Sequence, residues 1–221
     1  MSDDKRTALV VGATGLVGKE LVRILLQSGV YSQVKALVRN PVGIQHEKLI
    51  ERKIDFARLT EYEDEFDVDD VFCCLGTTIK KAGSQEAFKK VDYDYPLACA
   101  KMAKKSKQFL IISAIGADRN AKAFYSRVKG EVEKALLSMD LPSLHIFRPS
   151  LLLGERHEFR FGENLAAVLS PLISPLLKGK LKKFKPVQAK DLALAMYVCA
   201  KEERKGHHVY EGSRIFEMAG K

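Results

Sequence analysis

A glycine-rich segment near the start of the chain limits its possible folds more than any other feature. Gly12 lies at the end of an apolar run at residues 6–13, Gly15 follows it, and Gly18 opens an amphipathic stretch at residues 18–29. Glycines with this spacing, after a strand and before a helix, are typical of a loop that binds the diphosphate of a dinucleotide. A plain strand-to-helix turn is the alternative interpretation.

Each glycine of this loop has a separate physical task in the predicted site. Gly12 would permit the tight turn, Gly15 would let the backbone approach a phosphate closely, and Gly18 would let the helix pack against the strand. Backbone N–H groups and the positive end of the helix dipole would then attract the diphosphate.

Apolar, β-branched segments alternate with amphipathic ones over the first 150 residues. Beyond the first strand and helix, strands are expected near residues 34–39, 48–55, 71–76, 108–117 and 143–150, and helices near 91–106 and 125–138. Strands that are apolar on both faces belong to parallel sheets with helices on either side. The sequence therefore predicts the α/β class, with a doubly wound parallel sheet.

The length of 221 residues predicts one domain over residues 1–221. Loops dominate after Ser150, and helical periodicity returns at residues 191–200, so residues 150–190 are expected to form a small cap over the ligand cleft. Apolar runs are far shorter than the roughly 18 residues that span a bilayer, and the start does not resemble a signal peptide. A soluble, cytoplasmic protein is expected.

The formal net charge of +9 comes from two acid-free segments, residues 101–107 with four lysines and residues 178–190 with six. Lys101, Lys104 and Lys105 have the spacing of an exposed helix face. The segment KGKLKKFKP at residues 178–186 contains one aromatic residue and no known nucleic-acid motif. We expect neither nucleic acid nor membrane as a partner, whereas a protein partner could contact this basic segment.

The cysteines and histidines show no metal-ligand spacing, so no metal site is expected. Cys73, Cys74, Cys99 and Cys199 form no CxxC pair, and the five histidines form no HExxH motif. Reduced, buried thiols are the prediction, with Cys73 and Cys74 on opposite faces of a strand.

Arg39 lies 21 positions after Gly18, at the end of the second predicted strand. A site for NAD usually has Asp or Glu there to bind the ribose diol, whereas arginine can bind a 2′-phosphate through several N–H donors. The residue therefore favours NADP(H), with NAD(H) still possible. A solvated charge at the strand end is the alternative.

Ser113, Tyr125 and Lys129 form a candidate acid/base set. Ser113 ends an apolar run, and Tyr125 and Lys129 lie one turn apart on one face of a predicted helix. A nearby ammonium and an oxidised nicotinamide would favour a tyrosine phenolate, which could exchange a proton with an alcohol or carbonyl. Ser113 could hold the carbonyl oxygen by a hydrogen bond.

The YxxxK spacing alone is weak evidence, because Tyr31/Lys35 and Tyr197/Lys201 share it. Tyr125 differs by following a predicted central strand, at the carboxyl edge where doubly wound folds bind ligands. The alternative is a tyrosine and a lysine that pack against cofactor or helix without catalysis.

These residues together resemble the short-chain dehydrogenase/reductases. GATGLVG at residues 12–18, Ser113, YSRVK at 125–129 and FRPS at 147–150 occur in that family's order. Four further segments look like the atypical group that contains the Tat-interacting oxidoreductase and its bacterial relatives: LGTT at 75–78, KAGSQEAFKKVDYDY at 81–95, YSRVKGEVE at 125–133 and FRPSLLLGER at 147–156.

The resemblance implies a NAD(P)-binding Rossmann domain with a cofactor site spread over several loops. It places on the diphosphate Gly12, Thr14, Gly15, Leu16 and Val17. It places Arg39 on the adenosine phosphate, Asp55 and Phe56 near adenine, and along the cofactor Leu75, Gly76 and Thr77. Around the nicotinamide it places Ser113, Tyr125, Lys129, Pro149, Ser150 and Leu151.

Three functions follow as hypotheses. The first is an NADP(H)-dependent oxidoreductase that acts on a small carbonyl or alcohol, with Tyr125 as acid/base and Lys129 tuning it. The second is an NADP(H)-sensing protein that binds a protein partner without turnover, since fold likeness does not establish catalysis. The third is a sugar-nucleotide epimerase-like enzyme, although little sequence is left for a substrate domain after Ser150.

Overall fold

A parallel sheet of seven strands forms the centre of the computed structural model, which describes residues 5–154 and 184–221. The strands are β1 (Arg6–Val11), β2 (Tyr31–Val38), β3 (Leu49–Lys53), β4 (Asp70–Cys73), β5 (Gln108–Ile112), β6 (Ser143–Arg148) and β9 (Gly206–Glu211). Their order is β3-β2-β1-β4-β5-β6-β9, and each neighbouring pair is parallel. This arrangement is the doubly wound Rossmann fold, which confirms the predicted fold class.

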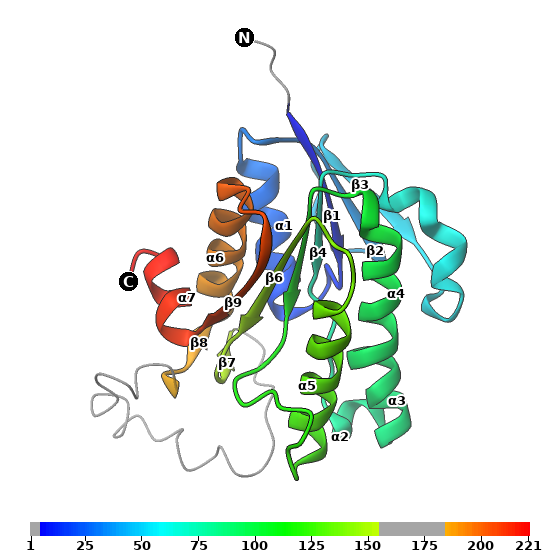
Figure 1. Ribbon diagram of the computed structural model, residues 1–221. Coiled ribbons are helices and arrows are strands. Elements are labelled where there is room, and N and C mark those ends of the chain that lie inside the picture. The colour runs from blue at the N-terminus through cyan, green and yellow to red at the C-terminus, as the bar shows by residue number, and fades with distance from the viewer. Residues whose placement is uncertain (1–4, 155–183) are drawn as a thin grey trace.

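Helices cover both faces of the sheet (Figure 1). On one face lie α1 (Leu16–Gln27) and α6 (Ala189–Glu202), and on the other lie α4 (Tyr95–Met102) and α5 (Phe124–Leu137). Each face has its own apolar core, because side chains alternate across the strands. Cys74 belongs to the first core and Cys73 to the second, as the strand alternation predicts.

The long helix expected at residues 91–106 is interrupted in the structure. A π-helical turn (η2, Lys90–Asp94) precedes α4, and a 3-10 turn (η3, Ala103–Lys105) follows it. Pro96 explains the π-helical turn, because proline has no N–H to donate to the carbonyl of Asp92 four residues earlier. Lys101, Lys104 and Lys105 are exposed, as their spacing indicates.

Several short elements were not expected from the sequence. They are the 3-10 helix η1 (Phe56–Phe66), α2 (Ile79–Ala82), α3 (Gln85–Lys89), α7 (Gly212–Met218) and the edge strand β9. The sequence of β9, GHHVYE, is mostly polar and half of its residues are exposed, so it lacks the apolar pattern of the inner strands. As an edge strand, β9 has a neighbouring strand on one side only, so it does not need to be apolar throughout.

The predicted cap region lies partly outside the described residues. Its two ends form a small separate sheet, in which β7 (Leu152–Leu153) pairs in parallel with β8 (Val187–Gln188). Residues 155–183, with most of the predicted cap and much of the basic segment, lie outside the described part of the chain.

A buried polar network joins the amino ends of the central strands. The Tyr31 hydroxyl donates to Asp70 (2.6 Å), the Gln108 amide donates to the same carboxylate (2.8 Å), and Arg6 lies 3.4 Å from it. Burial raises the pKa of the Asp70 carboxyl, although Tyr31, Arg6 and Gln108 oppose the shift. The network stabilises the edge of the sheet opposite the predicted ligand site, and it engages the hydroxyl of Tyr31.

Candidate cofactor and acid/base site

The glycine loop is a tight turn that only glycine can form at two positions. Gly12 has φ +85°, in the left-handed region, and a Cβ there would lie 2.7 Å from the carbonyl group of Cys74. A Cβ at Gly18 would lie 2.2 Å from the carbonyl oxygen of Gly12. The loop therefore packs backbone against backbone, with β4 on one side and α1 on the other.

Helix α1 begins directly after the first glycines of this loop. Gly15 is the N-cap residue of α1 and has no side chain to occupy the first N–H groups of the helix. The first turn contains no acidic residue. This end of the 12-residue helix therefore fits an anionic diphosphate, through its N–H groups and its dipole.

The residues expected to contact the adenosine half lie at the ends of β2 and β3. Arg39 directly follows β2 and is exposed. Asp55 follows β3, and its carboxylate accepts a hydrogen bond from the backbone N–H of Ala57 (2.9 Å) at the start of η1. The Phe56 ring packs on Tyr95 of α4, with 5.5 Å between the ring centroids.

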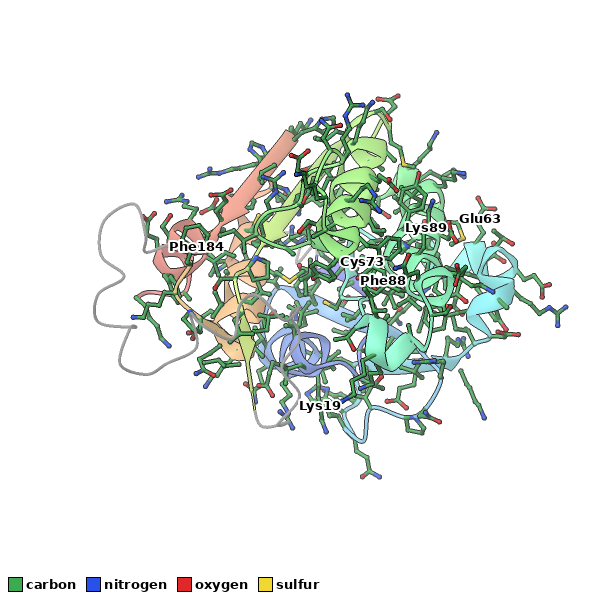
Figure 2. The ribbon with its side chains drawn as sticks, turned by 90° about the horizontal axis from the view of Figure 1, so that it is seen from below. Lys19, Glu63, Cys73, Phe88, Lys89 and Phe184 are labelled. Carbon is green, nitrogen blue, oxygen red and sulfur yellow. The ribbon has the colours of Figure 1, made fainter. Side chains whose placement is uncertain are left out.

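A small cavity of about 30 Å³ lies at the carboxyl ends of β4 and β5. The described residues that line it include Gly76, Thr77, Ser113, Tyr125 and Lys129, together with Leu75 and Asp92. Figure 2 views the molecule from this edge of the sheet, with Cys73 at the end of β4 near the middle of the view and Lys19 of α1 toward the outside. The structure thus brings together predicted residues from the loop after β4, the end of β5 and helix α5, which are far apart in sequence.

Tyr125 and Lys129 lie one turn apart on α5, as the sequence predicts. The Tyr125 ring packs against Phe88 of α3, with 5.5 Å between the centroids. Lys129 is almost completely buried. The other two YxxxK pairs differ, because Tyr31 and Lys35 lie on β2 and Lys201 sits over the Tyr197 ring on α6.

Asp92 belongs to this site, although sequence reasoning missed it. Its Oδ1 lies 2.7 Å from Nζ of Lys129, and its Oδ2 accepts a hydrogen bond from the backbone N–H of Thr77 (2.8 Å). The two side chains are 1% and 6% exposed, so water hardly screens the pair. Pro96, four residues later, is the sequence signal for the π-helical turn that carries Asp92.

The ion pair decides the charge of Lys129. Burial alone lowers the pKa of a lysine, but the attraction of Asp92 and Tyr125 outweighs it here. The pKa of Lys129 is therefore raised above its usual value, and the ammonium form persists inside the protein.

Ser113 is bound differently from the expected substrate-holding serine. Its hydroxyl donates to the Glu133 carboxylate, which also accepts from the Arg148 guanidinium (Nε to Oε1, 3.0 Å). Glu133 is four residues after Lys129, so Tyr125, Lys129 and Glu133 share one helical face. This spacing is the signal from which the sequence analysis could have identified Glu133.

Gly130 is a third residue that sequence reasoning missed, after Asp92 and Glu133. A Cβ at this position would lie 2.1 Å from the backbone nitrogen of Arg119. The Asp118–Arg119 backbone therefore contacts α5 directly beside Lys129, and only glycine permits that contact.

The segment after β6 reaches the same edge of the sheet. The Pro149 carbonyl accepts from the N–H of Ile115 (2.9 Å), and the Ser150 hydroxyl donates to the Lys185 carbonyl. Leu151 is buried, and its carbonyl accepts from the N–H of Val187 (2.8 Å). These bonds tie the end of β6 to β5 and to the start of β8.

Two other features of the described residues bear on function. The four cysteines are buried and reduced, as expected. None of the helices in the described ranges combines the length and the apolar character needed to cross a bilayer.

A family model and solved structures show which class of protein this chain resembles. The family model for NAD(P)H-binding proteins matches residues 12–149, which span the chain from the glycine loop to the end of β6. The fold resembles a short-chain dehydrogenase from Burkholderia cenocepacia in complex with NADP, with a TM-score of 0.68 and 17% identity over 100% of this chain and 93% of that chain. It also resembles human epimerase family protein SDR39U1 with NADPH (TM-score 0.60, 18% identity, 92% and 72% coverage).

Relatives in sequence identify the group within the NAD(P)H-binding proteins. Protein HTATIP2 of Rattus norvegicus is 38% identical over 167 residues, covering 73% of this chain and 69% of the relative. A protein of Eremothecium gossypii, named FMP52, mitochondrial, is 37% identical over 173 residues, with 75% and 76% coverage. The chain belongs to the NAD(P)H-binding Rossmann proteins, in the atypical short-chain dehydrogenase/reductase group.

Proposed function

We propose that the chain is an NADP(H)-dependent oxidoreductase of the atypical short-chain type that acts on a small carbonyl or alcohol. One observation carries the proposal: Tyr125 and Lys129 line a cavity together with Gly76 and Thr77, at the carboxyl edge of the sheet. Ligands of doubly wound folds bind at this edge. Hydride transfer is the chemistry that a bound nicotinamide cofactor supplies.

The glycine loop supports the first half of the proposal, which is cofactor binding. Gly12 and Gly18 leave two tightly packed positions of the turn without a side chain, and Gly15 leaves the start of α1 uncapped, which suits a diphosphate. Arg39 is exposed at the end of β2, where a guanidinium can bind a 2′-phosphate. NADP(H) is therefore the proposed cofactor, with NAD(H) as the weaker ligand.

Tyr125 supports the second half, which is proton transfer. Its hydroxyl would give a proton to a carbonyl oxygen, or take one from an alcohol, within hydrogen-bond reach. Lys129 keeps its charge through Asp92 and lies one turn away, so it would stabilise a phenolate at Tyr125. Substrate identity beyond a carbonyl or alcohol does not enter the proposal.

Tyr125→Phe tests this function. Because the phenyl ring keeps the packing against Phe88, NADPH affinity should stay within a few fold of wild type. Turnover of whichever carbonyl the wild type reduces, followed at 340 nm, should fall on the order of a hundredfold or more, as for the loss of a general acid. Equal turnover by the variant would remove Tyr125 from the reaction.

The alternative of an NADP(H)-sensing protein has one observation in its favour. The Ser113 hydroxyl donates its hydrogen bond to the Glu133 carboxylate, so the site has one fewer donor for a substrate carbonyl than expected. A sensing protein would bind NADPH without turnover and would capture a protein partner in only one ligand state. An epimerase-like enzyme would instead convert substrate without net change in absorbance at 340 nm.

The location and partners stay predictions. We expect the cytoplasm, and no nucleic acid or membrane as a partner. Several relatives are named as mitochondrial proteins, so fractionation of cells that express the full chain is the measurement to make.

A further inference from the structure

The cavity beside Lys129 contains a balanced pair of charges. Among the described residues that line it, Asp92 and Lys129 are the two that are charged at neutral pH, and they are 2.7 Å apart. Their charges cancel. Glu133 of α5 and Arg148 of β6 form a second ion pair with each other.

Both members of the Asp92–Lys129 pair are fixed in place. Asp92 is held through the backbone N–H of Thr77 on the loop after β4, and Lys129 is held on α5. The neighbours that act on the Lys129 ammonium are Asp92 of the π-helical turn, Tyr125 of α5 and Cys73 of β4. Burial of both charges leaves little water to screen them, so a third charge close by would interact strongly with each.

The two redox forms of a nicotinamide differ in charge, because the oxidised ring is a cation and the reduced ring is neutral. A cavity with an unpaired lysine would repel the oxidised ring, whereas a cavity with a balanced pair would not. We infer that Asp92 is the residue that lets this site bind the oxidised cofactor, by cancelling the charge of Lys129. This inference rests on the proposed function, since it requires the nicotinamide to bind beside Lys129.

The ratio of two dissociation constants, that of NADP⁺ divided by that of NADPH, measures this effect by calorimetry without any turnover. Contacts that the two forms share cancel in the ratio. Asp92→Asn should raise the ratio at least tenfold, because one unit charge at an effective dielectric near 20 still gives a tenfold effect at about 12 Å. A tenfold change corresponds to about 30 mV in the potential of the bound cofactor.

Each single variant leaves one charged side chain in the cavity, and the pH of each measurement is chosen so that this side chain stays charged. Asp92→Asn is measured at pH 6, where a buried lysine without its partner keeps more of its proton. Lys129→Met is measured at pH 8, where a buried carboxyl without its partner keeps more of its negative charge. The second variant should lower the ratio, and the double variant should bring it to within about threefold of wild type.

Asp69→Asn is a closely matched control. The Asp69 carboxylate also lies near a lysine (Lys107 Nζ, 2.9 Å) and accepts from a backbone N–H (Thr7, 2.7 Å), but it lies at the amino edge of the sheet. The same chemical change there should leave the ratio unchanged. Circular dichroism shows whether each variant is folded, and Lys129→Met and the double variant carry the test if Asp92→Asn does not fold.

The outcomes separate this inference from the proposed function. A rise for Asp92→Asn with a fall for Lys129→Met supports the inference. Folded variants that bind both forms with an unchanged ratio, or with shifts of the same sign, would overturn it and leave the proposed function standing. Wild-type protein that binds neither form would overturn both.

Discussion

The Gly12 carbonyl oxygen lies where a side chain at Gly18 would begin, at 2.2 Å from the Cβ position. Gly18→Ala must therefore displace backbone, which no rotamer change can avoid. We expect a loss of stability of about 3 kcal/mol, at the upper part of the usual range for overpacking. NADPH affinity should fall at least tenfold, because the loop moves with the backbone.

Gly29→Ala is the control for this substitution. A Cβ at Gly29 meets nothing within 4 Å, and its φ is not in the left-handed region. Urea unfolding and calorimetry should show wild-type stability and affinity for Gly29→Ala. Equal stability of Gly18→Ala and wild type would contradict the described loop geometry.

Arg39→Ser tests the proposed preference for NADP(H). Loss of the guanidinium should weaken NADPH on the order of tenfold or more and leave NADH within about twofold, since a charge-assisted bond to phosphate contributes about 1.5–3 kcal/mol. Arg214→Ser is the control, because it makes the same chemical change on α7, outside the proposed cofactor site. Arg214 is paired with Glu217 on that helix. Parallel losses for both cofactors would show that Arg39 does not distinguish them.

Ser113→Ala tests whether this serine holds a substrate oxygen. Its hydroxyl proton is engaged by Glu133, so we expect turnover to fall less than about tenfold, whereas loss of an oxyanion donor typically reduces turnover about 10²- to 10³-fold. Stability should fall by about 1.5–3 kcal/mol, the range for a hydrogen bond to a charged group. A hundredfold loss of turnover in a stable variant would restore the substrate-holding role.

His145 should make stability depend on pH. Burial, followed by the nearby His208 and Arg204, lowers the pKa of His145 to about 4, and its ring contacts Ser143 (2.7 Å) and Tyr210 (3.1 Å). Because the folded pKa is below the unfolded one of about 6.5, this contribution is complete above pH 6.5 and is lost as pH falls toward 4.

Urea unfolding from pH 7 to pH 4 measures this effect. His145→Gln should flatten the curve over that interval, while His46→Gln, at an exposed position, should keep the wild-type slope. An unchanged slope in folded His145→Gln would assign the pH dependence to other groups.

The features predictable from the sequence are those with local causes. Three glycines before an amphipathic helix define the loop, and the spacing of Tyr125 and Lys129 places both on one face of α5. Apolar strands predict a parallel sheet because both of their faces are covered. The distance of Arg39 from the glycine loop predicts its position at the end of β2, because a helix and a strand of nearly fixed length lie between them.

The features missed by the sequence analysis depend on contacts between distant segments. Asp92 reaches Lys129 and Thr77 because the fold brings the π-helical turn, helix α5 and the loop after β4 to one edge of the sheet. Ser113 meets Glu133 across the gap between β5 and α5. No periodicity along the chain encodes such pairs, although Pro96 and the position of Glu133 on α5 are signals in hindsight.

Calorimetric titration of the folded chain with NADPH, and separately with NADH, tests the central claim most directly. The account predicts saturable binding of NADPH with a dissociation constant below about 100 μM, which corresponds to roughly 5.5 kcal/mol, and weaker binding of NADH. Folded protein that gives no binding heat with either nucleotide at about 1 mM would contradict the account.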